Sequence, residues 1–100
     1  MLTACERILE YLPDNKENLA SSPMALDAIS RNFQVLGEAA KSISAQCKES
    51  HPEIHWQEIS GMRNIIVHAY FHVDAAIVHE TAQKDIPQLL RQLRVVLSKP

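Results

Sequence analysis

The segment GMRNIIVHAY, residues 61–70, is the most informative part of this sequence about fold and function. It places Arg63, Asn64, His68 and Tyr70 close together, separated by apolar residues. On a helix, where each residue turns by about 100°, Arg63 and Tyr70 nearly superimpose, whereas Arg63 and His68 are about 140° apart. The segment therefore predicts a helix with a buried side and a compact polar edge. That edge suits phosphate chemistry or an ordinary solvated face, and the spacing alone does not decide between them.

The composition favours an all-α fold. The chain has 100 residues, is 46% hydrophobic, and contains two glycines and five aromatic side chains counted as two Tyr, two Phe and one Trp. This length fits one domain, residues 1–100, with a modest core. Because aromatic residues are few, that core must consist mainly of Leu, Ile, Val, Ala and Met, which favours helices, and the scarcity of glycine argues against a turn-rich β protein.

Apolar residues at helical spacing predict an antiparallel bundle of four or five helices. The expected helices cover residues 2–12, 23–49, 56–69 and 75–97. Residues 70–73 are expected to form a corner, and Asp74 to cap the last helix. Residues 13–22 are expected to form a loop anchored by Leu19. Ser21 or Ser22 is expected to cap the second long helix, with Pro23 in its first turn.

Three positions in the two longest helices raise specific expectations. Met24 belongs to the apolar stripe expected to face the core. Gly37 interrupts the same run, which costs roughly 1 kcal/mol relative to Ala, so we expect another helix to approach it closely. Pro87 either kinks the last helix or begins a new one capped by Asp85.

The charge and the cysteines exclude several classes of function. The net charge is −2, so no basic field covers the whole molecule and any contact with RNA must be local. Cys5 and Cys47 are too few and too far apart to predict a metal site or a disulfide framework, which favours a cytoplasmic protein. We expect no membrane span and no signal peptide.

The histidines do not form a metal-binding motif. His51 and His55 are separated by one helical turn, but a proline lies between them. His68 and His72 have the same spacing, although we expect the helix to end between them. Neither a Cys-x-x-Cys nor a His-Glu-x-x-His pattern is present, so we predict no metal and no cofactor.

The pattern Arg63-x4-His68-x-Tyr70 resembles the signature of HEPN-domain ribonucleases, and more narrowly that of the HepT toxins of bacterial and archaeal toxin–antitoxin pairs. Three further segments resemble that family: AISRNFQVLGEAAK, residues 28–41; HPEIHWQEISGM, residues 51–62; and DIPQL, residues 85–89. The resemblance covers about residues 6–98. The first helix looks shorter than is usual in the family, so we expect it to be truncated.

The resemblance implies an all-helical HEPN bundle that forms a homodimer around the signature. It also implies metal-independent endoribonuclease activity as the toxin of a toxin–antitoxin pair. The partner would be a small nucleotidyltransferase antitoxin, which in this family can transfer AMP to the tyrosine of the signature, here Tyr70.

The chemistry of RNA cleavage fits these residue types. RNA supplies its own nucleophile, the 2′-hydroxyl. His68 suits the role of acid or base near neutral pH, and Arg63 suits the phosphate where negative charge accumulates. Asn64 could orient the imidazole or donate to the phosphate. Because Arg63 and His68 diverge on one helix, two copies across a two-fold axis are expected to pool them.

Two other interpretations remain open at this point. The chain could be a catalytically silent binding module that docks the nucleotidyltransferase, which the acidic net charge favours. It could also be a structural helical protein in which Arg63 pairs with Glu58 or Glu38.

Overall fold

The computed structural model describes residues 1–67 and 75–98, and of residues 63–67 and 98 it describes the backbone alone. The described part is helical, without strands, which confirms the all-α prediction. Its helices are α1 (Leu2–Tyr11), α2 (Lys16–Ala20), α3 (Pro23–Ser42), α4 (Ala45–Ser50), α5 (Trp56–Val67) and α6 (Ala75–Ser98).

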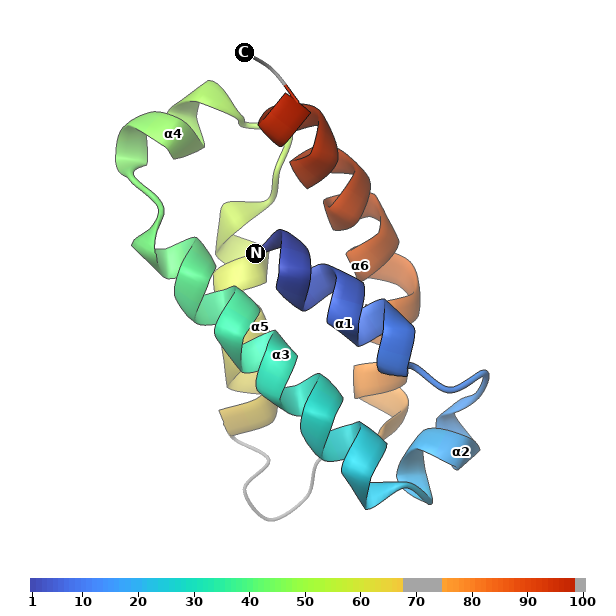
Figure 1. The fold of residues 1–100 in the computed structure, drawn as a ribbon. Coiled ribbons are helices and arrows are strands. Elements are labelled where there is room, and N and C mark those ends of the chain that lie inside the picture. Colours follow the sequence, from blue (N-terminus) through green and yellow to red (C-terminus); the bar gives the residue numbers. More distant parts are fainter. Residues whose placement is uncertain (68–74, 99–100) are drawn as a thin grey trace.

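The four long helices form an antiparallel bundle (Figure 1). Helix α1 lies between α3 and α6 and packs against both, while α5 packs on α3. The short helices α2 and α4 stand at opposite ends of the bundle. The Cα atoms extend over 42 × 24 × 17 Å, so the bundle is elongated along its helices.

The beginning of α3 follows the sequence prediction. Ser22 Oγ accepts a hydrogen bond from the backbone N–H of Ala25 at 3.3 Å, and Pro23 occupies the first helical position. A serine cap satisfies one of the N–H groups left without a partner at a helix start, and proline has no N–H to lose there. Ser22 is therefore the cap, and the alternative, Ser21, ends α2.

Two predicted segments, residues 13–22 and 23–49, have the wrong boundaries, and each contains a short helix that was not predicted. Residues 13–22 are not only a loop, because α2 forms within them when Asn15 Oδ1 accepts from Asn18 N–H at 2.8 Å. The expected helix 23–49 ends at Ser42, where Ile43 turns to an extended conformation. Ser44 then caps α4 by accepting from Cys47 N–H at 3.1 Å.

The core is a single cluster of mainly aliphatic side chains drawn from every helix except α4. Leu19 is fully buried, which confirms it as the anchor of its segment. Met24, by contrast, is 83% exposed, so its assignment to the core was wrong. It lies in the first turn of α3, at the start of the helix. The buried apolar residues are Ala4, Cys5, Ile8, Leu19, Ile29, Phe33, Leu36, Ala40, Ile54, Ile59, Met62, Val78, Ala82, Ile86, Leu89, Leu90 and Leu93.

Helix α6 settles the two alternatives for Pro87. The helix runs without interruption from Ala75 to Ser98 with Pro87 inside it, so Asp85 does not cap a new helix. The buried residues Ile86, Leu89 and Leu90 surround the proline in sequence. Burial of these side chains offsets the lost backbone hydrogen bond that a proline brings to a helix interior. None of the helices described is both long enough and apolar enough to cross a bilayer.

Candidate functional site

Helix α5 positions the first half of the signature. Trp56 begins the helix, as predicted, and its Nε1–H donates to the backbone carbonyl of His51 at 3.0 Å. Ile59 and Met62 are buried and hold one face of α5 against the core. Arg63 follows Met62 directly and lies one turn beyond Ile59, so the backbone places it at the edge of the packed face.

The predicted site residues divide between the described and the undescribed part of the chain. Arg63 and Asn64 belong to the described backbone of α5, and their side chains lie outside the description. His68 and Tyr70 lie outside the described residues, as do the predicted corner at residues 70–73 and the predicted cap Asp74. The roles of all four site residues therefore remain predictions.

A small cavity lies between α5 and α6. It has a volume of about 40 Å³ and is lined by His55, Glu58, Ile59, Met62, Asp85, Gln88, Leu89 and Gln92. Glu58 and Asp85 bring two carboxylates to this cavity, which disfavours a phosphate there. A cavity of this volume holds only a few water molecules. This cavity is therefore unsuited to an RNA phosphate.

Two of the described histidines contact carboxylate oxygen atoms of residues nearby in the sequence. His51 Nδ1 lies 3.3 Å from Glu53 Oε1, and His55 Nδ1 lies 3.3 Å from Glu58 Oε2. Within residues 1–67 and 75–98, no three His, Cys, Asp or Glu side chains are grouped so that they could hold a metal ion. The Glu58 carboxylate, one of the two expected ion-pair partners of Arg63, thus has His55 as its described partner.

One buried histidine was not predicted from the sequence. His79 is 7% exposed, and its Nε2 lies 3.0 Å from the carbonyl oxygen of Pro13. Because a carbonyl can only accept, Nε2 carries the proton in this contact. The bond ties the first part of α6 to the connection between α1 and α2. No local pattern could reveal it, because the two residues are 66 positions apart.

Two buried polar side chains lie on α3. Asn32 Nδ2 donates to the Ala28 carbonyl at 2.8 Å, so its amide is satisfied within its own helix. Ser30 is 9% exposed, and its Oγ has no hydrogen-bond partner among the residues that the structure describes. A buried hydroxyl without a partner is uncommon, because it loses its bonds to water. The burial of Ser30 therefore costs stability.

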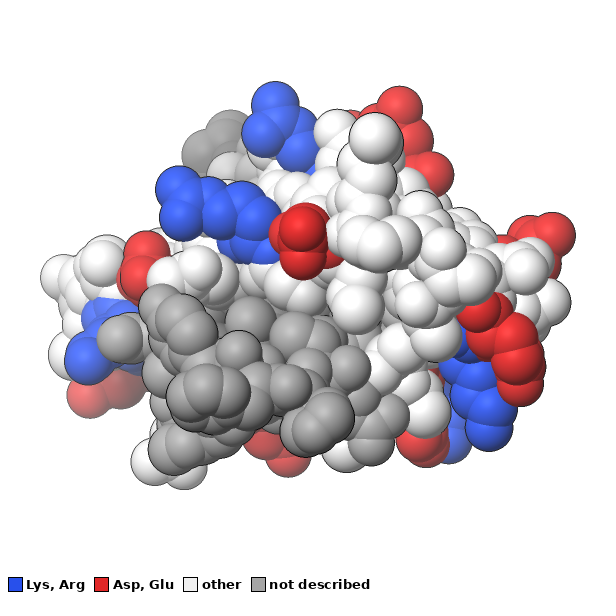
Figure 2. Space-filling view, turned by 90° about the horizontal axis from the view of Figure 1, so that it is seen from below, with Lys and Arg blue, Asp and Glu red and all other residues white. Residues whose placement is uncertain are grey.

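The charge on the surface is mixed. Figure 2 shows one end of the molecule, where groups of Lys and Arg side chains alternate with Asp and Glu side chains. This distribution agrees with the net charge of −2. An electrostatic attraction for nucleic acid must therefore come from a few local cations.

Comparison with known proteins identifies the family of this helical chain. The family described as "Ribonuclease HepT-like" matches residues 1–96, nearly the whole chain. A protein of Caldanaerobacter subterraneus subsp. tengcongensis named "Putative RNase" is 34% identical over 100 residues, which cover 99% of this chain and 89% of that protein. A "Probable ribonuclease HepT" of Thermococcus cleftensis is 44% identical over 62 residues, which cover 62% of this chain and 56% of that protein. No solved structure gives a significant match.

The fold and these relatives define a helical protein of the ribonuclease class, with the HEPN type of bundle. More narrowly, the chain belongs to the HepT-like ribonuclease family. The resemblance first seen in Arg63-x4-His68-x-Tyr70 is thereby confirmed at the level of the family.

Proposed function

We propose that this chain, as a single HEPN domain over residues 1–100, is a metal-independent endoribonuclease and the toxin of a toxin–antitoxin pair. The observation that carries the proposal is the family match over residues 1–96, which contains the whole pattern from Arg63 to Tyr70. The position of Arg63 and Asn64 on α5, next to the buried Met62, supports it, because a packed helix is a rigid base for catalytic side chains.

The proposed reaction uses the nucleophile that RNA already carries. His68 takes the proton of a 2′-hydroxyl, whose oxygen attacks the neighbouring phosphorus. The bond to the 5′-oxygen breaks, and that oxygen gains a proton from water or from His68 of the second copy. The products are a 2′,3′-cyclic phosphate and a 5′-hydroxyl. Arg63 stabilises the charge that develops on the phosphate, and Asn64 orients the imidazole or donates to the phosphate.

The proposed enzyme is a homodimer. On one helix, positions 63 and 68 are separated by about 140°, so a single copy presents Arg63 and His68 poorly to one phosphate. Two copies of α5 facing each other across a two-fold axis would pool both residues in one cleft. A site completed only in the dimer also fits a chain whose net charge is −2.

The proposed control point is Tyr70. A nucleotidyltransferase antitoxin would let the phenol oxygen attack the α-phosphorus of ATP, so that AMP becomes attached and pyrophosphate leaves. Positions 63 and 70 nearly superimpose on a helix. The added phosphate would therefore bring negative charge close to Arg63 and block an RNA phosphate.

Purified protein without its partner tests the proposal. We expect it to cleave single-stranded RNA in excess chelator and to leave 2′,3′-cyclic phosphate ends. Cleavage that stops in chelator and returns with a divalent cation would exclude the metal-independent mechanism. Incubation with the nucleotidyltransferase and ATP should add one AMP to the wild-type chain and none to the Tyr70→Phe variant.

The second candidate is a catalytically silent module that docks the nucleotidyltransferase, and the acidic net charge favours it. Mass spectrometry and RNA cleavage separate the two candidates. Modification of Tyr70 by a partner, with no RNA cleavage by the unmodified chain, would support the silent module. Cleavage without a partner would support the enzyme.

A further inference from the structure

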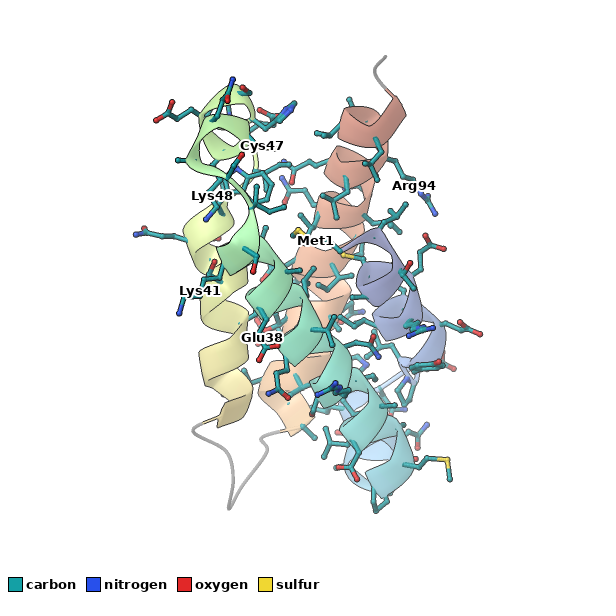
Figure 3. All side chains as sticks on the ribbon, turned by 60° about the vertical axis from the view of Figure 1, so that its left-hand side comes forward. Met1, Glu38, Lys41, Cys47, Lys48 and Arg94 are labelled. Atoms are coloured by element: carbon teal, nitrogen blue, oxygen red, sulfur yellow. The ribbon has the colours of Figure 1, made fainter. Side chains whose placement is uncertain are left out.

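Two lysines stand on the side of the bundle where α5 lies. Lys41 is in the last turn of α3, and Lys48 is near the end of α4. Figure 3 shows both side chains on the same side of the molecule, in front of α5. Because α3 and α5 run antiparallel, the end of α3 lies beside the start of α5.

The signature begins in the helix whose start lies beside the end of α3. Arg63 lies seven residues after Trp56, which begins the helix. At a rise of about 1.5 Å per residue, this separation is about 10 Å along the axis. The backbone position of Arg63 thus lies about 10 Å along α5 from the helix end that is beside the end of α3.

Neither lysine ammonium group forms an ion pair with a described residue. The ion pairs found in the described part of the chain join His51 to Glu53, His55 to Glu58 and Lys84 to Glu80. Lys41 is exposed and Lys48 is half-buried, as expected for a lysine that packs its stem and keeps its charge in water.

The carboxylates nearest in sequence leave these charges free. Glu38 lies three residues before Lys41, and Glu49 follows Lys48, yet neither forms an ion pair with its neighbour in the described structure. Figure 3 shows Glu38 on α3 near Lys41. An exposed carboxylate at this spacing attracts a lysine only weakly. Both lysines therefore stay available for an external anion.

We propose that Lys41 and Lys48 form a phosphate-binding track that leads the RNA substrate toward Arg63. This inference rests on the proposed ribonuclease function. Lysine ammonium groups bind phosphates as point charges and carry no base preference, so the track holds any single-stranded RNA and does not select its sequence. A local track also supplies the attraction that the net charge of −2 does not give.

A purely structural role for the same lysines has a different signature. Each lies near the carboxyl end of its helix, where a cation complements the helix dipole. That role predicts a small loss of stability on substitution and no change in the binding of RNA. Salt-dependent RNA binding separates the two roles, because each phosphate contact releases counterions.

The test uses Lys41→Gln, Lys48→Gln and the double variant, with Lys84→Gln as the matched control. Lys84 is exposed on α6 and pairs with Glu80 at 2.9 Å, so its replacement removes the same charge from a different surface. The probe is a 2′-O-methyl RNA oligonucleotide, which cannot be cleaved because it lacks the free 2′-hydroxyl. Affinity is measured by fluorescence anisotropy over a range of salt concentrations.

We expect the slope of log affinity against log salt to fall by about 0.7 per lysine and by about 1.4 in the double variant. At about 0.1 M salt, this corresponds to about fivefold weaker binding per lysine. The kcat for unmodified RNA at saturation should stay at the wild-type value, while kcat/KM decreases. Lys84→Gln should bind as the wild type does.

Two results would overturn the track. One is a double variant that binds RNA with the affinity and salt slope of Lys84→Gln. The other is a double variant that keeps RNA binding and instead loses an acidic protein partner. In both cases cleavage by the wild type would leave the ribonuclease proposal standing. If the wild type neither binds nor cleaves RNA, both proposals fail together.

Discussion

His79 Nε2 lies 3.0 Å from the Pro13 carbonyl oxygen and joins α6 to the connection between α1 and α2. His79 is 7% exposed, so this bond is one of the few buried polar contacts that cross between distant parts of the described chain. It closes a loop of 66 residues that includes α3 and α5. The bond therefore helps to fix the end of the bundle at which α6 begins.

Replacing His79 with Ala should lower the free energy of unfolding by about 1–3 kcal/mol, because the Pro13 carbonyl loses its partner in a half-buried position. His79→Gln should recover part of this loss, since its amide N–H can still donate. His55→Ala serves as the control, because His55 is exposed and its replacement should change stability by less than about 0.5 kcal/mol. Urea unfolding measures all three. Equal effects at positions 79 and 55 would contradict the assigned bond.

Gly61 lies inside α5, and a Cβ atom built on it meets no atom within 4 Å in the described part of the chain, apart from its own helix backbone and its chain neighbours. Gly61→Ala should therefore raise the free energy of unfolding by about 0.5–1 kcal/mol, because alanine loses less backbone entropy in a helix. Gly37, which is buried in α3, provides the contrast, and its replacement with Ala should destabilise the protein through overpacking. Thermal unfolding checks both. A destabilising Gly61→Ala would mean that another surface approaches α5 in solution.

Ionisation of the Cys5 thiol should lower the free energy of unfolding at alkaline pH. Burial raises the pKa of its thiol from 9.0 to about 11. Because the folded pKa is above the unfolded one, this contribution is complete below about pH 9 and is lost as the pH rises toward 11. Two pKa units correspond to at most about 2–3 kcal/mol. The free energy of unfolding, measured at about pH 8 and about pH 10.5, should fall further in the wild type than in Cys5→Ala. Parallel profiles would show that the thiol does not contribute.

The sequence predicted the long helices because their signals are local. The apolar spacing, the Ser22-Pro23 pair and Trp56 each define a helix or its beginning, and the structure confirms all of them. The short helices α2 and α4 were missed because they have too few residues for a periodic pattern. They depend on single caps, Asn15 and Ser44, which look the same in a loop.

Contacts between residues far apart in the chain could not be predicted from the sequence. Met24 fits the apolar stripe of α3 by its spacing, yet it lies where no neighbouring helix covers it and is 83% exposed. His79 has a partner 66 residues away, so its burial depends on the packing of α6. For the site, residue types and spacing pointed to the family that the comparison then showed, whereas Arg63, Asn64, His68 and Tyr70 keep the roles predicted for them.

The most direct test of the central proposal, a ribonuclease site shared by two copies, is complementation between two inactive variants. Arg63→Ala and His68→Ala should each abolish RNA cleavage while keeping wild-type helicity. A mixed dimer, purified with a different tag on each chain, joins an intact Arg63 of one copy to an intact His68 of the other. We predict that the mixed dimer recovers measurable cleavage of single-stranded RNA, above that of either variant alone. A mixed dimer as inactive as its parents, or a wild-type monomer with full activity, would contradict the shared site.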